Sequence, residues 1–406
     1  MTTDSLRRAE AREGRDASTF AAPASLDRVQ TLALLAGGVG AVLMAVGLFL
    51  SPAYFFRSWL VGWVFWMGIA LGCLAIYMLH HLTRGAWGLV ARRVLEAATR
   101  TLPVLLVLFL PLVFGMRELY EWARPEVVQA DEILRHKALY LNPTFFFIRL
   151  IVYFLIWGGF AWKLNRMSLQ QDRGDDPGLT RRMQFIAAFG VVGYCLAVTF
   201  ASIDWLMSLQ PHWFSTIYGV YLMGSQGLSA LAFLIVVAVY LSRREPMAAV
   251  IQPRHFHDWG KLLFAFVMLW AYFSFSQFLI TWSGNLPEET SFYFPRMQGG
   301  WGVLALVIVV FQFILPFGLL LSADLKRNGR ILAMVAAAIL VMRWLDYLWQ
   351  VEPAFHEHNA AFLWLYLAAP LAIGGAWVFF FVRELKKRPL LPIHDPYLPE
   401  AIAHEH

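Results

Sequence analysis

Long apolar runs separated by polar segments dominate this chain of 406 residues. A helix needs roughly 20 apolar residues to cross the hydrocarbon core of a bilayer. The first run follows a polar segment and is longer than the apolar part of a signal peptide, so we expect it to be retained. The pattern predicts an all-α polytopic membrane protein with ten transmembrane helices, over 30–51, 58–82, 88–114, 144–165, 183–204, 215–242, 260–284, 299–323, 330–350 and 360–383.

A short pattern occurs twice, each time at the end of an apolar run. The copies run Asp204-Trp-Leu-Met-Ser-Leu-Gln-Pro-His-Trp213 and Asp346-Tyr-Leu-Trp-Gln-Val-Glu-Pro-Ala-Phe355. They close the fifth and the ninth predicted span, and this even separation implies a parallel repeat. We therefore predict two four-helix bundles, spans two to five within 58–214 and spans six to nine within 215–359. A first helix with its outer loop (30–57) and a tenth helix with a tail (360–406) would flank them, after an N-terminal tail (1–29).

The basic residues of the loops predict the orientation. One set of loops carries most of the lysines and arginines, including Arg166, Arg244 and Lys386, whereas the opposite loops carry few. Basic loops remain in the cytoplasm, so both termini are predicted to be cytoplasmic. Both copies of the repeated pattern then face the outer side.

Composition narrows the function. The chain is 59% hydrophobic and 15% charged, and its 17 Trp, 33 Phe and 14 Tyr suit the aromatic belts of membrane interfaces. Its net charge of +6 therefore reflects orientation and gives no sign of nucleic-acid binding. Cys73 and Cys195, both inside apolar runs, offer no zinc or iron–sulfur motif. No histidine lies near the middle of a predicted span, so we expect no haem in this chain.

Ionisable residues inside membrane spans are costly and require a structural or functional reason. In the third span, Arg92, Glu96 and Arg100 share one helical stripe. This stripe is either a salt-bridge ladder between helices or a proton-uptake element in which Glu96 titrates. His80 and His81, at the cytoplasmic end of the second span, are either interfacial polar residues or proton-loading groups.

The predicted outer side carries a second set of candidates. Asp204 and His212 bracket the first copy of the pattern. Asp204 has no basic neighbour at helical spacing, so it is the better candidate for proton exchange. Arg343 and Asp346 in the second copy are spaced to pair with each other. Tyr272 and Ser276 of the seventh span would either hold a chain of waters or hydrogen bond between packed helices.

Four stretches resemble the ActF family of membrane proteins from bacterial alternative complex III, relatives of the NrfD-like polysulfide reductase membrane anchor. They cover 80–88, 202–219, 257–264 and 277–289, including Ser202-Ile-Asp-Trp-Leu-Met-Ser-Leu-Gln-Pro-His-Trp213. The resemblance implies a cofactor-free membrane subunit of a quinol:electron-acceptor (cytochrome c) oxidoreductase in the bacterial cytoplasmic membrane. It also implies proton-path candidates, with Asp204, His212 and Asp346 at the outer side, and His80, His81, Glu96, Asp258 and Lys261 toward the cytoplasm.

The resemblance also implies partners that carry the electrons. These are multihaem and monohaem cytochrome c subunits, an iron–sulfur subunit, small membrane subunits and a sister NrfD-like membrane subunit, in which quinol oxidation is usually placed. Haem c and iron–sulfur clusters are expected in those partners. Two other interpretations stay open: a stand-alone secondary transporter, and a second quinone-binding subunit with an aromatic groove near His212.

Overall fold

A computed structural model describes residues 17–403, apart from 175, 177 and 356–358. Within these residues every regular element is a helix, and ten segments are long and apolar enough to cross a membrane. The predicted class, an all-α polytopic membrane protein with ten spans, is therefore confirmed. The N-terminal part of the predicted tail, residues 1–16, lies outside the described residues.

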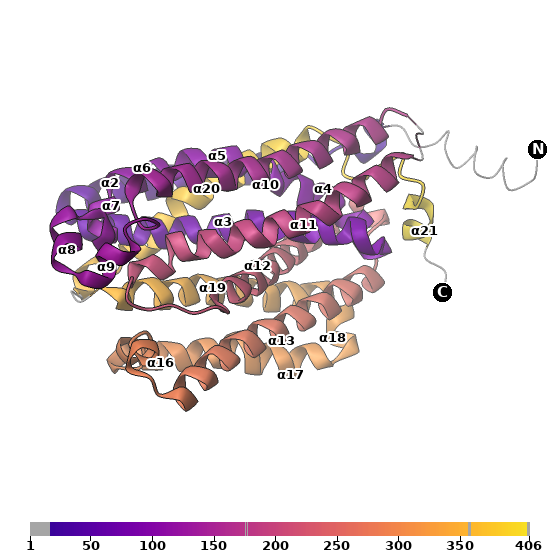
Figure 1. The fold of residues 1–406 in the computed structure, drawn as a ribbon. Coiled ribbons are helices and arrows are strands. Elements are labelled where there is room, and N and C mark those ends of the chain that lie inside the picture. The colour runs from indigo at the N-terminus through magenta and orange to yellow at the C-terminus, as the bar shows by residue number, and fades with distance from the viewer. Residues whose placement is uncertain (1–16, 175, 177, 356–358, 404–406) are drawn as a thin grey trace, which may run out of the picture.

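The ten spans comprise most of the helices in Figure 1, and short helices fill the connections. The spans are α2 (Ser25–Leu50), α3 (Pro52–Thr83), α4–α6 (Ala86–Thr99, Leu102–Leu108, Leu110–Phe114), α10 (Pro143–Gln171), α11 (Gly178–Trp205), α12 (Tyr218–Leu241), α13 (Pro253–Gly284), α16 with a π-helix and α17 (Gly299–Ile308, Val309–Ile314, Leu315–Leu321), α19 (Gly329–Val351) and α20 (Leu365–Lys386). The connections hold α7 (Met116–Leu119), α8 (Pro125–Ala130), α9 (Glu132–Lys137), α14 (Pro287–Thr290), α15 (Tyr293–Arg296), α18 (Ala323–Arg327) and α21 (Leu398–Ala403).

Several helices extend beyond the predicted apolar runs. Helix α2 begins at Ser25, inside the predicted tail, and α13 begins at Pro253 rather than at 260. At α13, Gln252 and His255 form a reciprocal capping box that starts the helix before its apolar part. Hydropathy predicts the part of a helix inside lipid, whereas capping groups determine where the helix begins.

The third span is interrupted. Helix α4 ends at Thr99, and α5 and α6 each carry a proline, Pro103 and Pro111, at their second position. Proline lacks a backbone N–H and clashes with the preceding turn, so it is tolerated at a helix start and breaks a continuous helix. The span therefore crosses as a series of short helices.

Helices α3 and α12 form the centre of the molecule and are the most buried spans. They pack against each other, and α3 also contacts α11, α19 and α20. At Gly72, an added Cβ would lie 2.0 Å from the carbonyl oxygen of Gln226, so only glycine allows this approach. The predicted bundles meet here, because α3 belongs to the first and α12 to the second; the repeat itself stays a prediction.

Helices α2 and α20 pack along their length at the side of this centre. A Cβ on Gly40 would lie 2.4 Å from the Ala372 nitrogen, and one on Gly375 would lie 2.3 Å from the Gly37 Cα. Small residues thus bring the two backbones into direct contact.

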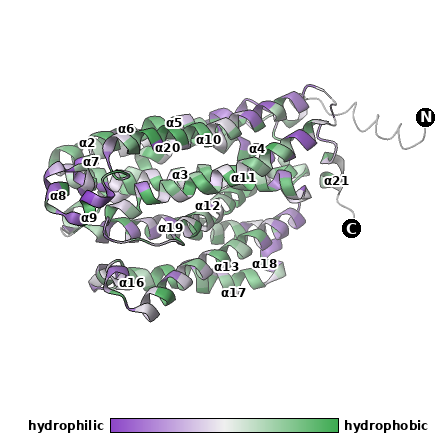
Figure 2. Cartoon of the chain, viewed as in Figure 1, coloured by the Kyte–Doolittle hydropathy of each residue, from purple (hydrophilic) through white to green (hydrophobic). Residues whose placement is uncertain are grey.

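Both ends of the described chain lie at the same end of the bundle (Figure 1), where the Leu390 N–H donates to the Phe20 carbonyl over 2.8 Å. We call this the terminal end, and we call the end that carries Pro211 and Pro353 the far end. Hydrophilic residues gather at both ends, and hydrophobic residues dominate between them (Figure 2). This distribution is the one expected of a bundle that crosses a bilayer.

Candidate functional site

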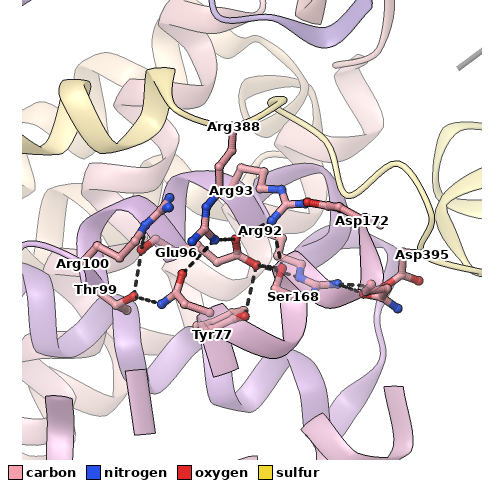
Figure 3. A network of polar contacts seen from close by, with 12 residues as sticks. Tyr77, Arg92, Arg93, Glu96, Thr99, Arg100, Ser168, Asp172, Arg388 and Asp395 are labelled. Atoms are coloured by element: carbon pink, nitrogen blue, oxygen red, sulfur yellow. Dashed lines mark hydrogen bonds and ion pairs between the residues drawn. The ribbon is translucent and has the colours of Figure 1, made fainter. Parts of the chain in front are cut away.

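A charged network surrounds Glu96 at the terminal end (Figure 3). The Glu96 carboxylate is fully buried and accepts from Arg92 Nε (2.9 Å), Arg93 Nη1 (2.7 Å), Ser168 Oγ (2.6 Å) and Tyr77 OH (3.1 Å). Arg92 and Arg93 reach it from the preceding helical turn. Arg92 and Glu96 thus form the ion pair that their spacing on one helix predicts.

Two further acids and a third arginine complete the network. Arg92 Nη1 lies 2.8 Å from Asp395 Oδ2, Arg93 pairs with Asp172, and Arg388 Nη1 lies 3.3 Å from Glu96 Oε2. The three arginines therefore face three carboxylates, which is the balance that a buried cluster requires. Burial raises the pKa of Asp172, and the charge of Arg93 opposes that shift.

Arg100, the third member of the predicted stripe, lies apart from the Glu96 carboxylate. Its Nε donates to the Glu96 backbone carbonyl over 3.3 Å and lies 3.8 Å from Glu384 Oε2. Arg100 thus ties the broken third span to α20.

His80 and His81 are both buried beside this network. The His81 ring packs edge-on against Tyr77, with centroids 4.7 Å apart. A Cβ on Gly88 would lie 2.0 Å from His80 Nδ1, so glycine at 88 makes room for the imidazole. His80 Nδ1 and His81 Nε2 have no hydrogen-bond partner in the described part of the chain. Each histidine therefore has one buried ring nitrogen without a partner among the described residues.

At the far end, Asp204 is buried at the end of α11. Arg149, from α10, binds it through two bonds of 2.8 Å, Nε to Oδ2 and Nη2 to Oδ1, and Tyr153 OH donates to Oδ2 over 2.7 Å. The guanidinium also lies 3.8 Å from the ring centroid of Tyr140. As expected, α11 itself offers Asp204 no basic partner. The partner, Arg149, comes instead from α10.

Asp346 occupies the equivalent place at the end of α19. Arg343 pairs with it one turn earlier, as predicted from the spacing, and Tyr221 OH donates to Oδ2 over 2.6 Å. Gln350 Nε2 donates to the same oxygen over 3.2 Å, and Gln350 Oε1 accepts from Tyr218 OH over 2.7 Å. Asp346 thus lies at the centre of a second polar network.

The π-helix Val309–Ile314 places Gln312 against this second network. With its amide oriented to satisfy both neighbours, the Gln312 oxygen accepts from Trp270 Nε1 (3.0 Å) and Arg343 Nη1 (3.1 Å). Single-turn π-helices inside α-helices often mark functional positions. Here the wider turn carries a buried amide to Arg343.

Arg296 joins the two copies of the repeated pattern. Its Nη1 donates to Gln210 Oε1 over 2.9 Å and its Nη2 donates to the Gln350 carbonyl over 2.5 Å. The guanidinium lies 3.6 Å from the ring centroid of Phe292. Burial lowers the pKa of Arg296 to about 9, which leaves it protonated near neutral pH. A buried cation thus holds the ends of α11 and α19 together.

A polar position near the middle of the bundle lies between the end networks. Tyr194 OH donates to Gln226 Oε1 over 2.6 Å, and both groups are buried. A Cβ on Gly68 would lie 3.0 Å from Tyr347 OH and 3.7 Å from Gln226 Cγ, so Tyr347 comes close to the same position.

The remaining predicted residues lie outside these networks. His212 Nε2 lies 2.7 Å from Asp131 Oδ2 in an exposed pair, and Asp258 and Lys261 form an exposed contact of 3.4 Å. Tyr272, on α13, is 64% exposed, and Ser276, one turn further along the same helix, is half-buried. The structure thus brings Glu96 together with His80 and His81, and Arg343 together with Asp346. The other five predicted residues lie apart from these groups: His212, Asp258, Lys261, Tyr272 and Ser276.

Sequence reasoning missed several residues of the networks: Arg149, Tyr153, Asp172, Arg296, Gln312, Arg388 and Asp395. The sequence could have indicated a role for Arg149, because it lies inside the predicted span 144–165. A charged side chain there needs a buried partner of opposite charge. The tail residues Arg388 and Asp395 carried no such signal.

The described residues hold no cluster of three or more metal-ligating side chains. No protein-family model matches the chain, and neither does any curated protein. The proposed function therefore rests on the fold, on the buried polar networks and on the resemblance of the four stretches.

Proposed function

We propose that the chain is a cofactor-free membrane subunit of a quinol:electron-acceptor (cytochrome c) oxidoreductase, scaffolding the complex and conducting protons. It would lie in the bacterial cytoplasmic membrane with both termini in the cytoplasm. Its partners would be the sister NrfD-like membrane subunit and the cytochrome c, iron–sulfur and small membrane subunits named above.

One observation carries the proton-conducting part: ionisable residues are buried at both ends of a membrane bundle, with polar side chains between them. Glu96 lies at the terminal end, Asp204 and Asp346 lie at the far end, and Tyr194 with Gln226 lies between. Buried charges in membrane proteins commonly mark ion or proton pathways.

The surroundings favour Asp346 over Asp204 as the outer exchange group. Asp204 is enclosed by Arg149 and Tyr153, whereas Asp346 lines a cavity. From Asp346, the route inward would pass Tyr347 and Gln226 and then need water to reach Tyr77 and Glu96. His80 and His81, beside Glu96, are the candidates for proton uptake on the cytoplasmic side.

The assembly is tested by purifying the tagged chain from native membranes in mild detergent. A c-type haem band in the reduced-minus-oxidised spectrum, with iron–sulfur and second membrane subunits co-purifying, would support the complex. A lone colourless protein, from membranes that contain those subunits, would overturn it.

The proton path is tested in vesicles that contain the assembled complex. Proton release per quinol oxidised is measured for Asp346→Asn and for Asp204→Asn. We expect slower release for Asp346→Asn, because the amide cannot exchange a proton. Unchanged rate and stoichiometry in both variants would remove the proton path from this chain.

The transporter alternative lacks matched interruptions. Secondary transporters typically break corresponding helices of their two halves. Here the interruptions lie in the third span, before α5, and in the eighth span, at the π-helix. In a parallel repeat of four spans these positions do not correspond.

A further inference from the structure

Lys326, on the short helix α18, is a cation without a carboxylate beside it at the terminal end of the bundle. The residue is only 8% exposed, and its ammonium group has no hydrogen bond or ion pair within the described part of the chain. The nitrogen lies 5.9 Å from the ring centroid of Phe264 on α13. A lysine whose carbon chain is buried while its charge reaches the edge of a membrane bundle requires an anion or water at its tip.

Glycine at 260 makes room for the carbon chain of Lys326. A Cβ on Gly260 would lie 2.8 Å from Lys326 Cγ and 3.1 Å from Lys326 Cδ. Because α13 and α18 pack against each other, the lysine chain lies directly on the surface of α13. The position of this cation is therefore built into both helices.

Two further cations lie near Lys326. They are Lys261 on α13 and Arg327 on α18, and all three charges act on His257 of α13, where Asp258 opposes them. Hydrophilic residues gather at this corner of the bundle, where α18 lies beside the beginning of α13 (Figure 2). The corner therefore carries a local excess of positive charge.

The two outer cations have only loose acidic neighbours. Lys261 Nζ lies 3.4 Å from Asp258 Oδ1, and Arg327 Nη1 lies 3.9 Å from Asp324 Oδ1. Both cationic side chains are more than half exposed, and ion pairs of this kind are worth little in water. An incoming anion can therefore engage both cations in addition to Lys326.

An aromatic, lipid-facing surface begins beside these charges. Phe264 contacts Phe317 of α17, with ring centroids 5.5 Å apart, and Met268 and Leu321 are 40% and 60% exposed. Lys261, Phe264 and Met268 are spaced by three and four residues, so they follow one stripe of α13. The charges thus lie at the end of an apolar stripe, as a headgroup lies at the end of its acyl chains.

We propose that Lys261, Lys326 and Arg327 bind the phosphate of an anionic phospholipid, and that an acyl chain of this lipid lies along Phe264 and Phe317. Lysine and arginine form charge-assisted bonds with phosphate, and basic pockets between membrane helices suit acidic headgroups. A lipid covers the charged and the aromatic part with one molecule, whereas an acidic peptide or a free phosphate covers only the first. The inference requires only that the chain crosses a membrane, so it does not depend on the proposed function.

The test uses the full chain in phosphatidylcholine nanodiscs and a photoreactive phosphatidylglycerol with a diazirine in one acyl chain. A phosphatidylcholine with the same photoreactive chain is the matched probe, and labelled peptides are located by mass spectrometry. We expect the phosphatidylglycerol probe to label 260–268 or 313–321 much more strongly than the phosphatidylcholine probe does. The difference should shrink as the salt concentration rises, because exposed charges are screened.

Each other outcome of this experiment overturns the proposal. Equal labelling by the two probes would make the surface an ordinary contact with bilayer lipid. Displacement of the phosphatidylglycerol probe by soluble glycerol 3-phosphate would make the cluster a site for soluble phosphates. No labelling by either probe would leave the cations to another acidic molecule, such as a segment of a partner protein.

Matched lysine variants separate this cluster from general surface charge. Lys326→Met removes the charge and keeps the length of the buried chain, and one basic residue at a membrane surface corresponds to roughly fivefold in binding. We expect labelling to weaken by about that factor, and Lys326→Arg to keep most of it. Lys163→Met is the control, because Lys163 is an exposed lysine of α10 toward the same end. Equal losses in Lys326→Met and Lys163→Met would contradict a specific site.

A variant confined to exposed residues guards against misfolding of Lys326→Met. Lys261→Gln combined with Arg327→Gln leaves the buried packing of α13 and α18 unchanged. We expect this double variant to label roughly fivefold more weakly than the unmodified chain, or weaker still. Unchanged labelling in both Lys326→Met and the double variant would overturn the cluster as the headgroup site.

Discussion

The two copies of the repeated pattern place an aspartate at the same point and give it different surroundings. Each acid is buried at the end of a span and is held by one arginine and one tyrosine. For Asp204 both partners come from α10, whereas Asp346 takes its arginine from its own helix and its tyrosine from α12. Trp205 packs edge-on against Trp63 in the first copy, while the second copy borders the cavity.

The comparison shows what a sequence pattern fixes and what it leaves open. Each copy places its acid in the last turns of a helix: α11 ends one residue after Asp204, and α19 ends five residues after Asp346. Neighbouring helices then decide whether that acid is enclosed or borders a space. The first copy is therefore a closed junction between helices, and the second lines a cavity.

The largest effect is expected from Arg343→Met, which leaves Asp346 buried without its cation. Removing one member of a buried ion pair costs about 3–5 kcal/mol of unfolding free energy. The measurement is unfolding of the purified chain in mixed micelles. The double variant Arg343→Met, Asp346→Leu should recover much of the loss, and no recovery would mean that Arg343 acts through other contacts.

A smaller loss is expected from Arg149→Met in the first copy. The Arg149 side chain is 16% exposed, so water can reach part of the space it leaves, and Tyr153 still donates to Asp204. We expect about 1–3 kcal/mol in the same assay. A loss as large as that of Arg343→Met would show that the partial exposure of the Arg149 side chain does not reduce the cost.

Gln350→Leu tests the polar network of the second copy. The change removes the partner of Tyr218 and one donor to Asp346, at about 1–2 kcal/mol. Ser208→Ala is the matched control, since Ser208 holds the same place in the first copy and bonds only the Asp204 carbonyl among its described contacts. We expect the control to lose less than Gln350→Leu, and the reverse order would contradict the comparison.

The smallest effect is expected from His212→Ala, which gives the first copy the alanine found at 354 in the second. Donation from the Leu134 N–H, with help from His212, lowers the pKa of Asp131. Its stabilisation is therefore present above its unfolded-state pKa and is lost only as the pH falls through the lowered value. At neutral pH Asp131 still caps α9, so thermal unfolding at pH 7 should not change measurably.

The spans and the local pairs were predictable because their signals are local. Apolar runs report membrane crossing, and the spacing of Arg92 with Glu96 and of Arg343 with Asp346 reports neighbours on one helix face. The bond from Arg149 to Asp204 depends on how two helices are rotated against each other. The contact of Asp395 with Arg92 joins positions 303 residues apart, and no periodic pattern encodes it.

The contact between α2 and α20 has a consequence for biogenesis. Gln30 donates to the carbonyl of Phe379, 349 residues further along the chain. At roughly 5–20 residues per second of synthesis, α2 waits on the order of 20–70 s for the helix that covers its glycines. During that time the glycine face of α2 lies open to lipid, to insertion factors or to other nascent helices. The contact that covers the glycines of α2 therefore forms only after the eight spans between α2 and α20 have been made.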